Sequence, residues 1–290
     1  MKAQLEQMTD ALDRLYMTYN RFDRIAPDPL QFVYQYASGE DREIVGFLSA
    51  VLAYGRVAHI QKSVTNLLAR LTSSPHDFVR QLNASDQKVL ASFTHRFNTG
   101  QDIYHVLLAI KHLLNECGSL EQAFLVGYDE QQPNIIPALA CFRDKLMSYI
   151  EPRHRQSGVR YLLVDPQKGS PCKRLNLFLR WMVRSDEVDT GLWTQVDPAK
   201  LVVPMDVHMS RLCRLIGFHD KRQMSLDTAL QVTMRFAEIC PEDPVKYDFA
   251  LSRVGILEQC KGEANPRCRA CELKRVCRDT LRIGSINNLV

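Results

Sequence analysis

Apolar residues recur every three or four positions along most of this chain, which is the spacing of one face of an α-helix. The clearest stripe follows the i, i+3, i+4, i+7 pattern and consists of Leu175, Phe178, Leu179 and Met182. No alternation of polar and apolar residues persists long enough to predict a strand, and no internal repeat is visible. The pattern predicts an all-α protein, with helices expected over residues 5–19, 40–52, 60–71, 103–114, 119–126, 136–146, 173–182, 207–216 and 244–260.

Two of the expected helices begin at residues that could carry chemistry. Gly169-Ser170-Pro171 predicts a tight turn, which places Lys173 in the first turn of the next helix, beside free backbone N–H groups. Asp206 follows Pro204-Met205 and is predicted to be the N-cap of a second helix. A lone lysine at such a place is usually solvated and a lone aspartate usually only caps, so each residue taken singly favours the structural interpretation.

Four of the nine cysteines crowd into residues 260–290, with the spacing C-x7-C-x2-C-x5-C. Four thiolates at short spacing suit a tetrahedral Zn²⁺ ion or a [4Fe–4S] cluster. A zinc ribbon normally shows two C-x2-C pairs and this tail has one, which favours iron–sulfur over zinc. The predicted metal ligands are Cys260, Cys268, Cys271 and Cys277, whereas the other five cysteines are expected to pack in the core or between helices.

Composition places few other constraints on function. An apolar fraction of 46% and a charged fraction of 24% are those of an ordinary soluble protein, and the net charge of +4 restricts any nucleic-acid surface to a local patch. No apolar run approaches the ~20 residues of a membrane span. The amino terminus has no signal-peptide pattern, and the odd cysteine count argues against a secreted disulfide scaffold. We therefore expect a cytoplasmic protein.

The segments KRLNLFL (173–179) and MDVHMSRL (205–212), together with the cysteine tail, resemble the helix-hairpin-helix DNA glycosylases, in particular a bacterial endonuclease III-like branch. That family ends in a C-x6-C-x2-C-x5-C loop that holds a [4Fe–4S] cluster. The resemblance implies that Lys173 is a Schiff-base nucleophile and Asp206 the catalytic carboxylate. This chain departs from the family at the hairpin, where Gly169-Ser170-Pro171-Cys172 replaces the usual G-V-G motif, and Pro171 removes one N–H that could bind phosphate.

The resemblance also implies a domain organisation and a partner. Residues 38–185 would form a helical barrel ending in the hairpin, and residues 1–37 plus 200–290 a second helical domain with the cluster loop at 260–277. The partner would be double-stranded DNA bound by a monomer associated with the nucleoid. FLSAVLAYGRVAHIQK (47–62) is similar to the segment that reaches the DNA near the extruded base, although its tyrosine could equally end a core helix. The implied DNA contacts are Tyr54, Gly169, Ser170, Lys261, Arg267 and Lys274.

These observations predict a bifunctional DNA glycosylase with abasic-site lyase activity, which removes a damaged, for example oxidised, base. A non-catalytic protein that binds damaged or structured DNA on the same fold is the alternative, and the altered hairpin keeps it open. A third hypothesis is a zinc-stabilised helical interaction module. Residues 75–155 lie outside the resemblance.

Overall fold

The computed structural model describes residues 2–155, 157–258, 260–263 and 266–278. It is mostly helical, which confirms the predicted all-α class. Its α-helices are α1 (Lys2–Tyr19), α2 (Gly39–Val51), α3 (Val57–Leu68), α4 (Pro75–Gln81), α5 (Gln87–Leu90), α6 (Gly100–Cys117), α7 (Leu120–Leu125), α8 (Ile136–Ser148), α9 (Ser157–Leu162), α10 (Lys173–Val183), α11 (Val207–Leu215), α12 (Leu226–Ala237) and α13 (Asp248–Ile256).

Short 3-10 helices and one small hairpin complete the structure. The 3-10 helices are η1 (Phe22–Arg24), η2 (Pro29–Gln35), η3 (Ala84–Asp86), η4 (Pro152–His154), η5 (Pro166–Lys168), η6 (Pro198–Lys200), η7 (Pro266–Arg269) and η8 (Glu272–Arg275). The hairpin pairs β1 (Thr94–His95) with β2 (Asn98–Thr99) in antiparallel register. Among the described residues, no helix is long and apolar enough to cross a membrane.

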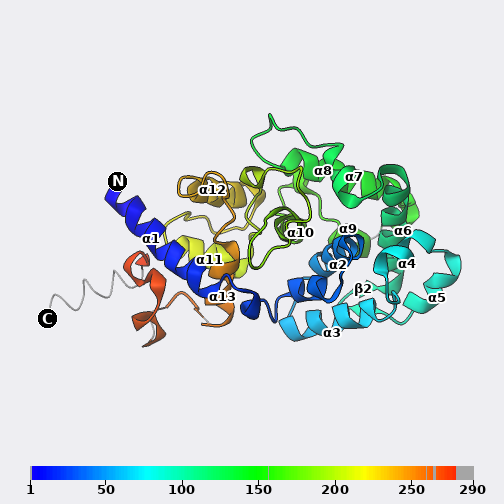
Figure 1. Ribbon diagram of the computed structural model, residues 1–290, viewed down its shortest axis with the longest axis horizontal. Helices are drawn as coiled ribbons and strands as arrows, with labels where there is room; N and C mark the ends of the chain where they lie inside the picture. The colour runs from blue at the N-terminus through cyan, green and yellow to red at the C-terminus, as the bar shows by residue number, and fades with distance from the viewer. Residues whose placement is uncertain (1, 156, 259, 264–265, 279–290) are drawn as a thin grey trace.

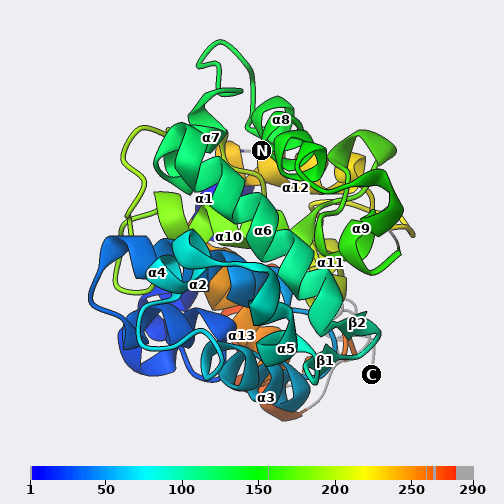
Figure 2. The same ribbon diagram turned by 90° about the vertical axis from the view of Figure 1, so that its right-hand side faces the viewer.

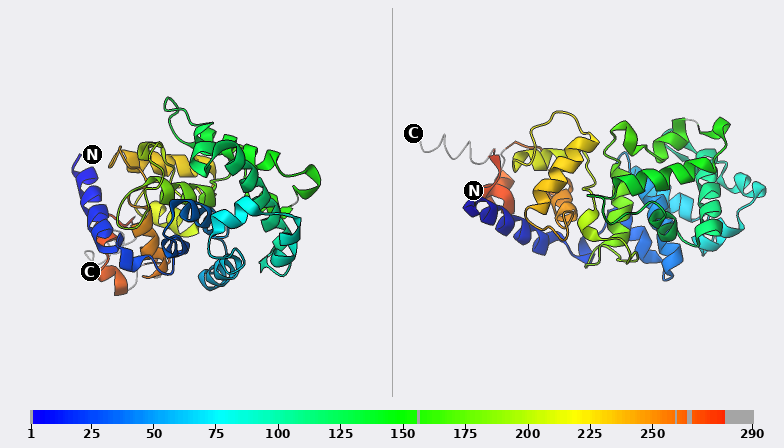
Figure 3. Two further views of the ribbon diagram at one scale, coloured as in Figure 1. Left: turned by 45° about the vertical axis from the view of Figure 1, so that its right-hand side comes forward. Right: turned by 90° about the horizontal axis from the view of Figure 1, so that it is seen from above.

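The molecule is elongated, with α10 near its middle (Figure 1). Helices α2 to α9 gather at one end, and α1, α11, α12 and α13 at the other (Figures 1 and 3). Seen from the first of these ends, α6 runs across the face and begins beside the β1–β2 hairpin (Figure 2). Every residue of α10 after Lys173 is buried, so this helix forms the core that the two ends share.

The first helix packs against the last described part of the chain. Leu12 and Leu15 of α1 are buried, and α1 lies along α13 and η8 (Figure 1). Arg14 pairs with Glu272 at 3.0 Å, and the Tyr19 hydroxyl donates to Glu258 at 2.9 Å. The division into two domains, residues 38–185 and residues 1–37 plus 200–290, stays a prediction. It requires α1 to pack against the end of the chain, and the contact of α1 with α13 and η8 is of that kind.

A buried ion network holds α10 in place. Arg180 of α10 pairs with Asp248 at the start of α13 and with Asp189, whose Oδ1 is 3.2 Å from the guanidinium. Arg184, which follows α10, pairs with Asp243 at 2.9 Å. The two arginine side chains are only 2–3% exposed, and replacing either one by an apolar residue would leave buried carboxylates without their cation, at a cost of about 3–5 kcal/mol. The network fixes the helix that carries Lys173 relative to α13.

Three expectations from the sequence need correction. The last helix begins at Asp248 and not at Pro244: Asp243 pairs with Arg184, and the chain makes turns before the helix starts. The β1–β2 hairpin was not expected, and neither were α4, α5, α9 and α12. Of the cysteines outside the tail, Cys172, Cys213 and Cys240 are buried as expected and Cys117 is half-buried, but Cys141 is exposed and lies against Gly127.

Candidate functional site

Lys173 is the first residue of α10, as the sequence predicted. The turn before it is held by local bonds. Cys172 takes the left-handed conformation (φ 43°), its N–H donates to Ser170 Oγ at 3.2 Å, and the Asn176 side chain donates to the Pro171 carbonyl at 3.0 Å. These bonds set the direction in which Lys173 leaves the helix start.

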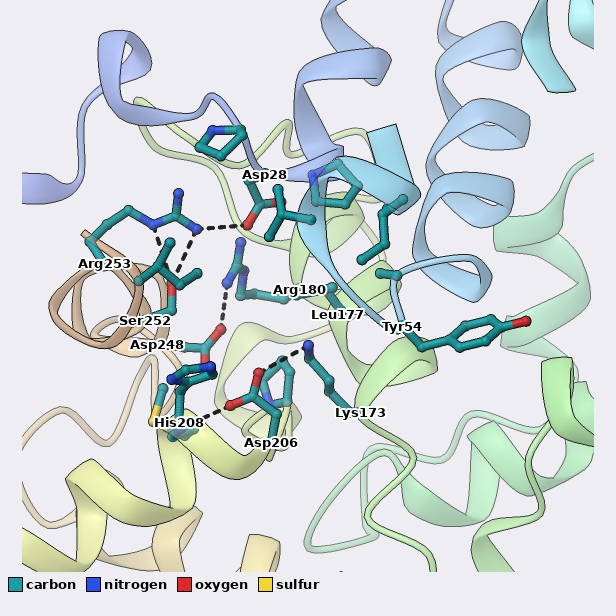
Figure 4. A pocket seen from close by; sticks show the side chains of 18 of the residues that line it. Asp28, Tyr54, Lys173, Leu177, Arg180, Asp206, His208, Asp248, Ser252 and Arg253 are labelled. Atoms are coloured by element: carbon teal, nitrogen blue, oxygen red, sulfur yellow. Dashed lines mark hydrogen bonds and ion pairs between the residues drawn. The ribbon is translucent and has the colours of Figure 1, made fainter. Parts of the chain in front are cut away.

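Asp206 is the N-cap of α11, which confirms the second predicted helix start. Its Oδ1 accepts from the Met209 N–H at 2.8 Å. Its Oδ2 lies 3.0 Å from Lys173 Nζ, although the two residues are 33 positions apart in the sequence. The side chains are 33% and 29% exposed, so the starts of α10 and α11 present an ion pair that solvent and a ligand can reach (Figure 4).

The environment keeps Asp206 charged. Burial raises the pKa of this carboxyl, but the Lys173 ammonium and the Met209 N–H together outweigh burial, so the net pKa lies below the ordinary value of 3.8. A fixed carboxylate at this place can stabilise a positive charge that develops beside it.

Two cavities meet at the Lys173–Asp206 pair. One, of about 190 Å³, runs from the pair to a group of buried charges on α10, α13 and the segment before η2 (Figure 4). The other, of about 410 Å³, opens toward α9 and the turn at Ser170. Both cavities are lined by Tyr54, Lys173 and Asp206, so the two adjoin at the pair, and we call them together the groove.

The buried charges at the end of the smaller cavity were not found from the sequence. Arg180 and Asp248 form one pair, and Arg253 Nη2 lies 3.0 Å from Asp28 Oδ2 in the other (Figure 4). A signal existed for Arg180, because it stands inside the apolar run Phe178 to Val183, where a charge needs a partner. Asp28 is 225 positions from Arg253, and no local pattern links them. His208 packs against Gly255.

Tyr54 lies in the groove but is held by its neighbours. Its hydroxyl donates to Asn98 Oδ1 and lies 3.1 Å from the His95 carbonyl oxygen, both in the β1–β2 hairpin. The Arg174 guanidinium covers the ring at 4.9 Å from the centroid. The role of Tyr54 as a DNA contact stays a prediction. Its side chain is half-buried, and its hydroxyl group is already hydrogen-bonded to the β1–β2 hairpin.

Gly169 and Ser170, in the turn between η5 and α10, lie at the surface beside the larger cavity. The Gly169 N–H donates to the Pro166 carbonyl at 3.0 Å, its carbonyl accepts from Leu226 N–H at 2.8 Å, and Ser170 Oγ accepts from Cys172. The Gly169 N–H is therefore engaged within the protein. A phosphate contact at this turn stays a prediction, and Pro171 has no N–H to offer it.

The cysteine tail folds over α1 and α13. Cys260, Cys268 and Cys271 line a cavity of about 230 Å³ together with Tyr19 and residues of the same segment. Burial raises the pKa of the Cys271 thiol; the Leu273 N–H lowers it, and the nearby Cys260, Cys268 and Cys277 raise it again. The other three tail cysteines therefore lie in the neighbourhood of Cys271.

No metal-binding group of three or more His, Cys, Asp or Glu side chains is formed within the part of the chain that the structure describes. The donor set itself, three cysteines that line one small cavity and Cys277 in the same segment, is chemically of the kind that holds an iron–sulfur cluster or zinc. The three predicted phosphate-contacting cations, Lys261, Arg267 and Lys274, are all exposed in or beside this segment.

Comparison with known proteins gives a family without an activity. No curated protein and no solved structure matches the chain. One family model, described as "Protein of unknown function (DUF2400)", matches residues 28–257, which include α2 to α13 and both sides of the groove. Because the match covers most of the chain, the protein belongs to the DUF2400 family.

Proposed function

We propose that the protein is a DNA glycosylase with abasic-site lyase activity, which excises a damaged base. One observation carries the proposal: Lys173 Nζ and Asp206 Oδ2 lie 3.0 Å apart at the facing starts of α10 and α11, in a groove open to solvent. An amine and a carboxylate in this arrangement are the two groups that N-glycosidic bond cleavage by a lysine needs.

The reaction divides between the two side chains. As the bond from C1′ to the base breaks, the sugar takes on oxocarbenium character, and the Asp206 carboxylate stabilises that charge. The Lys173 ammonium must first lose one proton to solvent. The neutral amine then forms the bond to C1′ as the bond to the base breaks, and a second proton passes from the nitrogen to the departing base. Cleavage of the bond from C1′ to O4′ opens the sugar ring, O4′ takes up a proton, and the protonated Schiff base remains. β-Elimination of the 3′ phosphate then cleaves the strand. The nucleotide must first leave the duplex stack to reach the groove.

The proposal is tested by trapping a covalent intermediate. The protein is incubated with duplexes that each carry one damaged base or one abasic site, and borohydride is added to reduce the imine. A stable protein–DNA adduct on at least one duplex is expected. If no lesion and no abasic site gives an adduct while duplex binding is strong, the protein is the non-catalytic DNA-binding alternative, for which the engaged N–H of Gly169 is the favouring observation.

We propose further that Cys260, Cys268, Cys271 and Cys277 hold a [4Fe–4S] cluster. The cluster would cross-link a segment whose described residues enter the core through two large apolar side chains, Leu273 and Val276. Its contribution would be structural, since the cavity that the cysteines line is distinct from the Lys173–Asp206 groove.

Replacement of Cys271 by Ser should remove the cluster and loosen the tail. Protein prepared without oxygen should lose its iron and its brown colour and should melt at a lower temperature, because metal binding contributes directly to folding. Cys141→Ser is the matched control, since Cys141 is an exposed cysteine outside the tail. Stoichiometric zinc without iron in the native protein would contradict the iron–sulfur assignment.

DNA binding should weaken when the tail cations are reversed. The double change Arg267→Glu and Lys274→Glu should lower affinity for all duplexes alike and flatten its salt dependence, because these contacts would neutralise phosphates. Arg80→Glu with Lys88→Glu is the matched control. Arg80 lies in α4 and Lys88 in α5; both are exposed, and both helices are at the end of the molecule opposite the cysteine tail (Figure 1). Equal effects of the two double changes would show that the tail is not a specific contact.

A further inference from the structure

An exposed phenylalanine stands at the tip of the β1–β2 hairpin. Phe97 is 51% exposed, and it follows Arg96, whose φ of 57° is left-handed. An arginine in this conformation is costlier than the glycine or asparagine that such turns prefer. The turn therefore has a strained backbone at Arg96, and it leaves the side chains of Arg96 and Phe97 exposed.

Phe97 belongs to a cluster of three aromatic rings. Its ring centroid is 4.5 Å from that of Tyr161 and 5.8 Å from that of Tyr54, and the two tyrosine rings are 4.8 Å apart. Tyr161 comes from α9 and Tyr54 from the loop between α2 and α3, so three separate segments build one surface. Exposure differs within the cluster, since Tyr161 is 39% exposed whereas Tyr54 is half-buried.

The cluster is rigidly supported. Tyr54 is bonded to the hairpin through Asn98 and His95, and His95 Nδ1 lies 2.8 Å from Ser63 Oγ of α3. The buried Arg174 guanidinium lies under both tyrosines, 4.9 and 4.5 Å from their centroids, and donates to the Val51 carbonyl at 2.8 Å. A ring held in this way loses little conformational freedom when a ligand stacks on it.

The cluster stands at the mouth of the groove. Tyr54 and Tyr161 line the larger cavity together with Lys173 and Asp206. The side chains within cation–π distance of the rings are two arginines, Arg96 at 5.9 Å from Tyr54 and Arg174. Aromatic rings beside fixed cations suit a ligand with flat π faces and negative charge, which is the chemistry of nucleotides.

We propose that Phe97, backed by Tyr54 and Tyr161, enters the duplex beside the extruded nucleotide and stacks on the neighbouring base. This inference rests on the proposed function, because it needs a duplex opened at the groove. It gives the exposed ring of Phe97 the role that the sequence alone suggested for Tyr54, whose hydroxyl is bonded and whose ring is covered by Arg174. The ring of Phe97 would give the neighbouring base the stacking contact that it lost when the nucleotide left the duplex.

The test is the affinity for a duplex that contains one tetrahydrofuran abasic-site analogue, measured by fluorescence anisotropy. Phe97→Ala should weaken this binding about 5- to 150-fold, the range that loss of one base–aromatic stack produces. Phe97→Tyr should restore most of it. Binding to undamaged duplex should change little, because the closed stack offers no place for the ring.

Phe22→Ala is the matched control, since Phe22 is also exposed, at 59%, and lines neither cavity of the groove. Circular dichroism confirms that each variant is folded. If Phe97→Ala binds the abasic duplex as tightly as the native protein, the stacking inference is overturned while the proposed function stands. If the native protein itself shows no preference for the abasic duplex and gives no borohydride adduct, the proposed function fails.

Discussion

The Lys173→Gln protein should give no borohydride adduct with any lesion-bearing duplex. A glutamine amide nitrogen cannot attack C1′ or form an imine, so the trapped fraction should fall at least about 10³-fold relative to the native protein. The fold should survive, because the Lys173–Asp206 pair is partly exposed and such pairs contribute about 1 kcal/mol or less. Gel analysis of adducts and thermal melting measure the two effects.

Lys168→Gln is the matched control for this change. Lys168 is exposed in η5, five positions before Lys173, and its loss also removes one cation near the turn. The control should trap like the native protein and show the same small loss of duplex affinity. Undiminished trapping in Lys173→Gln would place the nucleophile on another residue.

Replacement of Asp206 by Asn should separate base excision from Schiff-base formation. Asparagine caps a helix about as well as aspartate, so α11 should keep its start. The negative charge is lost, and release of the damaged base should slow about 10²- to 10³-fold. Trapping on a preformed abasic site should persist, because the sugar aldehyde there reacts with Lys173 without cleavage of a glycosidic bond.

Asp197→Asn provides the comparison for the cap alone. Asp197 caps η6 by accepting from the Ala199 N–H at 2.9 Å and lines neither cavity of the groove. Its variant should excise at the native rate. A loss of stability in Asp206→Asn without a specific loss of excision would mean that Asp206 only caps α11.

The pH dependence of stability gives a second readout for Asp206. Because the pKa of this carboxyl is lowered in the folded protein, its ionisation stabilises the fold above the ordinary value of 3.8, and that contribution disappears as the pH falls through the lowered value. The difference in unfolding free energy between the native protein and Asp206→Asn should thus be largest near neutral pH and shrink in strong acid.

The two helix starts were predictable because their signals are local. The turn at Gly169-Ser170-Pro171 and the cap at Asp206 each involve only a few neighbouring residues, and both starts were found where expected. The 3.0 Å contact between Lys173 and Asp206 depends on how α10 and α11 pack, which only the family resemblance suggested.

Other parts of the site depend on contacts between distant residues. Asp28, at the start of η2, and Arg253 of α13 meet only through the tertiary fold, and no local pattern in either segment predicts the contact. The β1–β2 hairpin has strands of two residues, too short for any alternation to be seen. The Asp243-Pro244 pair predicts a helix start, but the Asp243 carboxylate instead pairs with Arg184, a buried arginine that follows α10.

The packing of α1 against η8 has a consequence for how this protein is made. Arg14 and Glu272 are 258 residues apart, so at about 5 to 20 residues per second a ribosome needs roughly 13 to 50 s to supply the partner of the first helix. During that interval the apolar face of α1, with Leu12 and Leu15, has emerged without the surface that covers it. The nascent chain therefore exposes this apolar face, which is the kind of surface that chaperones cover, until its cysteine-rich end appears.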